Sequence, residues 1–135
     1  MSGLSYLLDT DWIIDHLCGV TSTTQKLLEL APHGLAISVI SLAELYEGVH
    51  HSRDPLQSMA SMRQFLAGVT VFTIEEQVCS RFGMERGRLR KRGHTVGDFD
   101  LLIACTAICQ GLTVCTNNRR HFEMIEGVTL LSARQ

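Results

Sequence analysis

The chain has 135 residues, of which 45% are hydrophobic and 19% are charged. A chain of this length and composition buries enough surface to form a core without disulfides or a structural metal, which excludes disordered, collagen-like and disulfide-scaffold proteins. With 12 Lys and Arg against 14 Asp and Glu, the formal net charge is −2, which excludes nucleic-acid binding through bulk positive charge but leaves a local basic patch open. We expect one domain over residues 1–135.

Short apolar segments alternate with helical patterns along the chain. Residues 4–8, 35–40, 69–74 and 112–115 are almost wholly apolar runs typical of buried parallel strands, and residues 128–131 form a weaker fifth run. Helical patterns occupy residues 12–17, 24–30, 42–49, 56–66, 75–92 and 101–109. The alternation predicts an α/β fold with a mainly parallel sheet. Between residues 49 and 66 helices follow one another, which predicts a helical hairpin that projects from the sheet.

The cysteines and the apolar runs bear on the compartment. The five cysteines, at positions 18, 79, 105, 109 and 115, are odd in number and contain no Cys-x-x-Cys pair. Three of them lie in apolar stretches, where a free Cys packs as a small hydrophobe, so we expect a reducing cytoplasm. The first residues lack the basic segment of a signal peptide, and no apolar run approaches the ~20 residues that cross a bilayer. We therefore expect neither secretion nor membrane anchoring.

Four polar side chains fall near the carboxyl ends of the predicted strands, where open parallel sheets carry their chemistry. Asp9 closes the first strand, and Glu44 falls in the first turn of the helix that follows the second strand. Asp100 opens the helix before the fourth strand, and Asn118 comes just after that strand. We therefore expect the four side chains to point to one edge of the sheet.

A group of carboxylates needs a positive charge among them, because two unit charges about 4 Å apart repel by ~4 kcal/mol at an effective dielectric near ~20. Oxygen ligands without paired His or Cys suit Mg²⁺ or Mn²⁺ better than Zn²⁺, and Mg²⁺ keeps several waters. A bound ion of this kind can activate water and stabilise the leaving oxygen of a phosphodiester. The pattern therefore favours a metal-dependent nuclease.

Each acidic residue also has a purely structural interpretation. Asp98 or Asp100 could cap the following helix, a contact worth about 1 kcal/mol, and Glu44 could interact with the helix dipole. Asp9 has fewer structural uses, because it directly follows a buried apolar strand. Because all of these residues are expected at one edge of the sheet, we favour a shared functional site over a separate structural role for each.

With these residues in place, the sequence resembles the PIN-domain family and, within it, the VapC-like toxins of bacterial toxin–antitoxin pairs. The resemblance rests on residues 6–15, 40–48, 96–107 and 112–122, which read YLLDTDWIID, ISLAELYEG, VGDFDLLIACTA and LTVCTNNRRHF. It implies a three-layer α/β/α sandwich on a short, mainly parallel sheet, and Mg²⁺- or Mn²⁺-dependent endonucleolytic cleavage of RNA. It also implies a homodimer and a cognate antitoxin that covers an apolar groove.

The resemblance assigns the principal site residues. The family's first-strand Asp falls on Asp9, its helix Glu on Glu44, and the Asp before Leu-x-Ile-Ala on Asp100. These three are expected to hold the metal. Asn118 falls on a fourth polar position that is often Asp; because its amide is neutral, it can coordinate or orient water but adds no charge.

Three further residues are expected to support this site. Thr116 matches the family's small hydroxyl residue after the fourth strand. Asp98 is an additional carboxylate two residues before Asp100, and Asp11 lies where such proteins often have Asn or Ser.

A basic stretch closes the long helical pattern at residues 75–92. It holds five of the 12 basic residues within seven positions, namely Arg86, Arg88, Arg90, Lys91 and Arg92. Such a cluster can follow an RNA backbone by neutralising phosphates. The alternative is a solvated helix end, whose cations stabilise the helix dipole.

Several other residues are expected to be structural. His50 and His51 lack further ligands at metal spacing and are expected on the surface, whereas Cys105 and Cys109 are expected in the core. The apolar residues expected in packing or in an interface are Trp12, Leu17, Met59, Met62, Phe65 and Leu66.

Two other functions stay open from the residues alone. Asp9 and Asp11 after a buried strand are similar to the Asp-x-Asp nucleophile and acid of haloacid-dehalogenase-like phosphatases. That family needs a downstream Lys, as phosphoacceptor receivers do, and here Lys26 and Lys91 do not follow a later strand. The second is a degenerate nuclease fold that only binds RNA or a partner, which loss of the acidic positions would favour.

Overall fold

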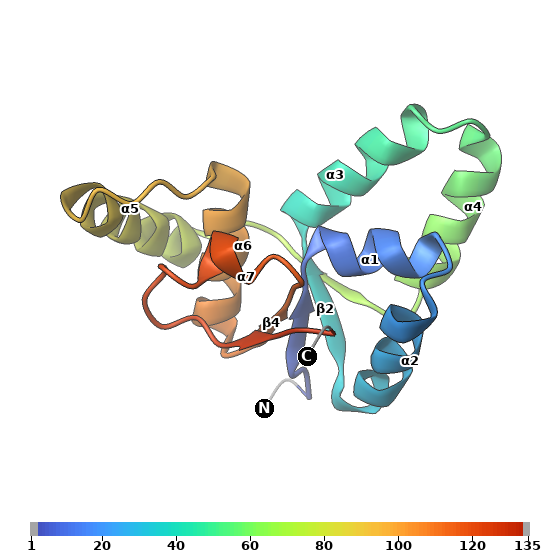
Figure 1. Cartoon of the computed structure of the whole chain (residues 1–135), viewed down its shortest axis with the longest axis horizontal. Coiled ribbons are helices and arrows are strands. Elements are labelled where there is room, and N and C mark those ends of the chain that lie inside the picture. Colours follow the sequence, from blue (N-terminus) through green and yellow to red (C-terminus); the bar gives the residue numbers. More distant parts are fainter. Residues whose placement is uncertain (1–2, 134–135) are drawn as a thin grey trace.

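Five short strands form one parallel sheet at the centre of the molecule (Figure 1). A computed structural model describes residues 3–133. The strands lie in the order β3-β2-β1-β4-β5, and all four pairings between neighbours are parallel. Their bounds are β1 Tyr6–Leu8, β2 Leu35–Ser38, β3 Thr70–Phe72, β4 Thr113–Cys115 and β5 Leu130–Leu131.

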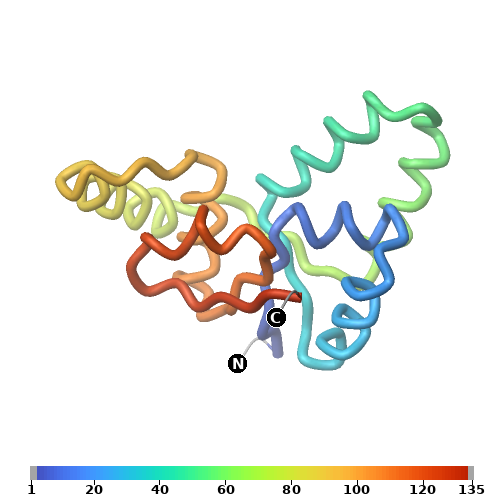
Figure 2. Tube along the Cα trace, viewed as in Figure 1, coloured from blue at the N-terminus to red at the C-terminus, as the bar shows by residue number. Residues whose placement is uncertain are grey.

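Helices cover both faces of this sheet (Figure 2). On one side lie α1 Thr10–Leu17, α2 Thr21–Leu30, α3 Val39–His50 and α4 Pro55–Leu66, with a 3₁₀ turn at Ala31–His33. On the other side lie α5 Glu76–Lys91, α6 Asp98–Gln110 and the single turn α7 Arg119–Phe122. The three-layer α/β/α sandwich is therefore confirmed.

Two hydrophobic cores show the alternation that buries both faces of the sheet. On β1, Leu7 packs into the core beneath α5 and α6, whereas Leu8 packs into the core beneath α1 to α4. Val114 and Cys115 on β4 divide in the same way. Successive strand residues point to opposite faces, so strands covered on both sides read as continuous apolar runs.

The path of the chain places a switch point at the centre of the sheet. From β1 the chain moves to β2 and β3 on one side, and it then returns to β4 on the other side of β1. The backbone N–H of Asp9 donates to the carbonyl of Cys115 at 2.9 Å, which continues the ladder between β1 and β4 past the last strand residue. Open α/β sheets bind ligands at such a point, at the carboxyl ends of the strands.

The predicted elements are all present, although several of their bounds differ and one further turn occurs. The helix of Glu44 begins at Val39 rather than at residue 42, because the hydroxyl of Ser38 accepts from the N–H of Ile40 and ends the strand there. The last strand is limited to Leu130–Leu131. Turn α7 was not predicted, since four residues are too few for a helical pattern.

The predicted helical hairpin is confirmed, since α3 and α4 pack against each other at the edge of the molecule (Figure 1). Trp12 and Met62 are fully buried in the core of this side, as expected for packing residues. His50 and His51 are exposed, and Cys105 is buried. Cys109 is only half-buried. Within residues 3–133, no helix combines the length and apolar character that crossing a membrane requires.

Candidate active site at the carboxyl edge of the sheet

A cavity of about 460 Å³ opens at the carboxyl edge of the sheet, between α6, α7 and the start of α3. It brings together the four residues that the sequence placed there, Asp9, Glu44, Asp100 and Asn118, and also Asp98. The other lining residues are Thr10, Gly97, Phe99 and His121. The predicted convergence of these side chains is therefore present in the structure.

Asp9 is held rigidly at the floor of the cavity. Its side chain is 5% exposed and caps α1, accepting a hydrogen bond from the N–H of Thr10 at 2.8 Å. Its second oxygen accepts from the hydroxyl of Thr116 at 2.8 Å, and that hydroxyl accepts in turn from the N–H of Asn118 at 3.0 Å. Thr116 thus links the ends of β1 and β4, and it holds Asp9 in one orientation.

Glu44 reaches the cavity from the second turn of α3, so the expectation that it occupies the first turn is wrong. An interaction of its carboxylate with the helix dipole is therefore a weaker explanation for Glu44, because that effect is confined to the first turn. The hydroxyl of Thr10 donates to Oε1 of Glu44 at 2.6 Å and lies 3.0 Å from the hydroxyl of Ser41. These hydroxyls orient the carboxylate.

Asp100 lies in the first turn of α6, but Gly97 is the N-cap residue and no side chain caps this helix. The helix-cap interpretation of Asp98 and Asp100 is therefore wrong. Nδ1 of His121 lies 3.1 Å from Oδ2 of Asp100, and its side chain is 56% exposed. Burial raises the pKa of Asp100, and the neighbouring His121 partly offsets this rise.

Asp11 supports the site from outside the cavity. Its Oδ2 accepts from the N–H of Asn117 at 2.9 Å and from the side-chain amide of Asn118 at 3.3 Å. The side-chain oxygen of Asn117 accepts from the indole N–H of Trp12 at 3.2 Å and from the N–H of Ala133 at 3.1 Å. These contacts fix the segment that carries Asn118 into the cavity.

The electrostatics of the site favour a bound cation. Burial, with the charge of Asp11 as the second cause, raises the pKa of Asp9 from 3.8 to about 7. Nearby positive charge would reverse this effect, because it stabilises the ionised carboxylate. The donors are carboxylate, amide and hydroxyl oxygens, which suit Mg²⁺ or Mn²⁺.

The spacing of these donors suits a hydrated ion. In the described part of the chain, no three His, Cys, Asp or Glu side chains lie close enough together to enclose an ion by themselves. Mg²⁺ does not require that arrangement, because it retains several waters and binds few carboxylates directly. The residues present therefore fit a divalent ion that is bound in part through water.

The basic stretch of α5 divides into two groups in the structure. Arg86 donates to the carbonyl of Val96 at 2.8 Å and pairs with Asp98 at 2.6 Å. Arg88 forms a salt bridge with Glu85, which is 2% exposed, and donates to the carbonyl of Met124 at 2.8 Å. Both guanidinium groups are engaged within the chain, which favours a structural role for them, and their contact with RNA stays a prediction. Arg90, Lys91 and Arg92 are exposed.

Sequence reasoning missed Thr10, Asn117 and His121. Thr10 lies between Asp9 and Asp11, and its hydroxyl directly after a strand-end carboxylate is a sequence signal that could have identified it. His121 follows Asn118 by three positions, which places both on one face of a turn only once α7 is known. No local signal identifies Asn117, because its partners lie at both ends of the chain.

Comparison with known proteins decides the family. The PIN domain model matches residues 6–127. The chain belongs to the PIN domain family. This PIN domain is 32% identical over 127 residues to the tRNA(fMet)-specific endonuclease VapC of Salmonella typhimurium, covering 94% of this chain and 96% of the relative. It is 30% identical over 125 residues to the protein of the same name from Shigella flexneri, covering 93% and 95%.

The fold comparison agrees with the sequence comparison. A crystal structure of VapBC2 from Rickettsia felis bound to a DNA fragment from their promoter contains a chain that superposes with a TM-score of 0.89 at 30% identity. The match covers 96% of this PIN domain and 98% of that chain. The resemblance to PIN-domain and VapC-like proteins is therefore confirmed, and the phosphatase alternative loses its support.

Proposed function

We propose that this PIN domain is a divalent-metal-dependent endoribonuclease that acts as the toxin of a type II toxin–antitoxin pair. The observation that carries the proposal is the single cavity in which Asp9, Glu44, Asp100 and Asn118 meet at the switch point of the sheet. The relatives named VapC are ribonucleases, and PIN-domain nucleases of this kind are generally dependent on divalent metal.

Asp9, Glu44 and Asp100 would hold Mg²⁺ or Mn²⁺, which supplies an activated water and stabilises charge on the leaving oxygen of the phosphodiester. The chain's own contribution is to fix the donors before substrate arrives. Thr116 and the N–H of Thr10 orient Asp9, the hydroxyl of Thr10 orients Glu44, and Asp100 rests against His121. Such preorganisation lowers the free energy that would otherwise be spent on arranging the site.

Asn118 would position water or phosphate without adding charge. Its amide nitrogen is directed to Asp11 at 3.3 Å, which leaves the carbonyl oxygen as the group that can accept from water or coordinate an ion. Asp98 pairs with Arg86 and is 76% exposed, so its part in the site is to shape the rim.

The proposal includes an antitoxin that contacts an apolar groove next to the site. A second cavity of about 370 Å³ lies between α1, α3 and α4, where Ile14, Leu17, Leu45 and Val49 provide its apolar lining. Structures of similar fold are VapBC complexes, which supports a protein partner on this domain. A homodimer and a cytoplasmic location are also part of the proposal; the five free cysteines are compatible with a reducing compartment.

The test of catalysis is RNA cleavage by the purified chain with Mg²⁺ or Mn²⁺ and with excess chelator. Because the Salmonella and Shigella relatives are named tRNA(fMet)-specific endonucleases, initiator tRNA is the first substrate to test, beside total RNA. We expect cleavage only with metal, and its loss in Asp9→Asn but not in the exposed control Glu123→Gln. Equal cleavage by Asp9→Asn, or cleavage in chelator, would contradict the proposal.

A further inference from the structure

If the chain is a ribonuclease, as proposed above, it must hold RNA near the carboxylates. The acidic cavity alone is a poor surface for RNA. Asp9, Glu44, Asp98 and Asp100 all line the cavity, so the field at its mouth repels phosphate. A bound ion compensates only part of this charge. The energy for holding RNA must therefore come from contacts beside the carboxylates.

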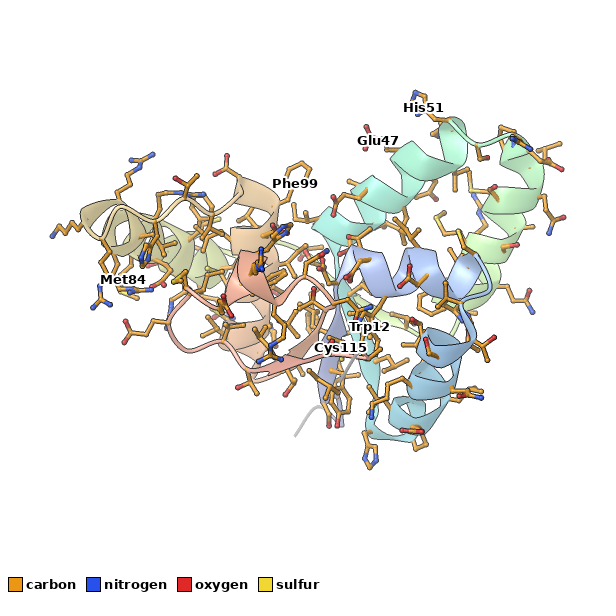
Figure 3. The ribbon with its side chains drawn as sticks, viewed as in Figure 1. Trp12, Glu47, His51, Met84, Phe99 and Cys115 are labelled. Carbon is orange, nitrogen blue, oxygen red and sulfur yellow. The ribbon has the colours of Figure 1, made fainter. Side chains whose placement is uncertain are left out.

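Phe99 provides one such contact. Among residues 3–133 it is the one Phe, Trp or Tyr side chain that is exposed, with 53% of its surface accessible. It lies between Asp98 and Asp100 in the first turn of α6 and lines the acidic cavity. Figure 3 shows it on the side of α6 that faces α3. An apolar ring at the rim of a polar cavity offers a stacking surface for an unpaired base.

Arg119 and Arg120 provide the second contact. Both are exposed on α7, and their side chains have no hydrogen-bonding or ionic partner within residues 3–133. They line a cavity of about 350 Å³ that shares Asn118 and His121 with the acidic cavity, so the two cavities adjoin. Cations in this position can neutralise phosphates on one side of the cleavage site.

We propose that a single-stranded RNA segment lies across α6 and α7, with a base stacked on Phe99 and its backbone phosphates on Arg119 and Arg120. This path places the intervening phosphate at the carboxylates and Asn118.

The end of α5 is less suited to this role. Arg86 and Arg88 are engaged within the chain, and Figure 1 shows the C-terminal end of α5 at the extremity of the molecule, whereas α7 packs beside α6 near its centre. Arg90 and Arg92 therefore serve as the matched control for Arg119 and Arg120.

The first experiment measures the affinity of an end-labelled, mixed-sequence single-stranded RNA in the cleavage-deficient Asp9→Asn background with Mg²⁺ present. Phe99→Ala should weaken binding by about 5- to 140-fold, the range for one stacked base, and Phe99→Tyr should restore it. Phe99→Leu should not restore it, because it keeps apolar volume without the ring face. Met84→Ala is the control, since Met84 is 61% exposed on α5, away from the site (Figure 3).

The second experiment varies the salt concentration. Loss of both phosphate contacts in the double variant Arg119→Gln/Arg120→Gln should reduce the slope of log affinity against log salt by about 1.4, which is twice the ~0.7 expected for each phosphate on a single strand. Phe99→Ala should leave the slope unchanged, because stacking releases no counterions. The double variant Arg90→Gln/Arg92→Gln should leave both affinity and slope close to those of the parent.

A perfectly paired duplex of the same sequence separates stacking from a structural effect. Its bases are already stacked inside the helix, so the affinity for duplex should not respond to Phe99→Ala. In the active chain, Phe99→Ala should raise KM more than it lowers kcat. The inference would be overturned if Phe99→Ala left the affinity for single strands unchanged or weakened the affinity for duplex equally. It would also be overturned if the salt slope fell in the double variant of α5 instead of the double variant of α7.

Failure of the inference and failure of the proposed function give different results. If the active chain cleaves RNA with metal and Phe99→Ala binds normally, the ribonuclease stands and the RNA path is wrong. If the active chain fails to cleave any RNA but the Phe99 and Arg119 effects on binding are present, the path stands and the catalytic proposal is wrong.

Discussion

The substitution Asp9→Asn should stabilise the metal-free protein at alkaline pH. In the folded chain the pKa of Asp9 is raised from 3.8 to about 7, chiefly by burial and then by the charge of Asp11. A group whose folded pKa is raised contributes stability that is fully present below the unfolded pKa and is lost as pH rises through the folded pKa. Ionised Asp9 therefore weakens the metal-free fold above about pH 7.

The size of the effect follows from this difference. A rise from 3.8 to about 7 corresponds to an upper limit of ~4 kcal/mol at alkaline pH. Asparagine can still accept from the N–H of Thr10, but its amide replaces the oxygen that accepts from Thr116, at a cost of about 1 kcal/mol. We expect a net gain of about 2 kcal/mol at pH ~8, which is a rise in Tm of roughly 6 to 10 °C for a chain of this size.

The assay is thermal unfolding in chelator at pH ~5 and pH ~8, beside the control Glu123→Gln, an exposed carboxylate. At the lower pH the folded wild-type Asp9 is protonated whereas the unfolded carboxyl is ionised, so most of the gain should disappear. Added Mn²⁺ should then raise the Tm of the wild type and not that of Asp9→Asn, because a ligand that binds only the native state stabilises it. Equal Tm changes at both pH values, or a less stable variant at pH ~8, would refute the reasoning.

Three further substitutions test the supports of the site. Glu85→Gln should lower the free energy of unfolding by about 1.5 to 3 kcal/mol at neutral pH, because the charge-assisted hydrogen bonds that lower the pKa of this carboxyl are lost. Urea titrations should show that this difference from the wild type shrinks as pH falls through the lowered pKa. Thr116→Val should destabilise by about 1 to 3 kcal/mol in thermal melts and raise the pKa of Asp9 further, whereas Thr116→Ser should not. Asn118→Asp places a second carboxylate beside Asp11, so melts in chelator should show lower stability at alkaline pH and recovery with Mg²⁺; an unchanged Tm would contradict this.

The sequence was sufficient to predict the sheet and the acidic cavity, because both depend on local signals. Each strand is an apolar run, and Asp9 directly follows one of them. Once the strands are taken as parallel, their carboxyl ends must lie at one edge, so the convergence of Asp9 with Asn118 follows without knowledge of any side-chain contact.

The contacts that orient these residues could not be predicted, because they join segments far apart in the chain. Thr10 reaches Glu44 across 34 positions, and Thr116 reaches Asp9 across 107. Arg88 belonged to a basic run whose local pattern indicated either solvent or RNA. Its actual partners include Met124 and Glu126, which come close only after α7 turns the chain back beside α5.

Turn α7 depends on anchors at both of its ends, which explains why so short an element can serve the site. Before it, Asp11 and Thr116 accept from the backbone of Asn117 and Asn118. After it, Glu85 accepts from the N–H of Glu126 at 2.8 Å, and the neighbouring guanidinium groups of α5 hold the carbonyls of the same segment. A single turn makes too few internal hydrogen bonds to be stable alone, so its position is set by these contacts. The Glu85–Arg88 ion pair of α5 therefore acts on the active site through α7, although its charges lie outside the cavity.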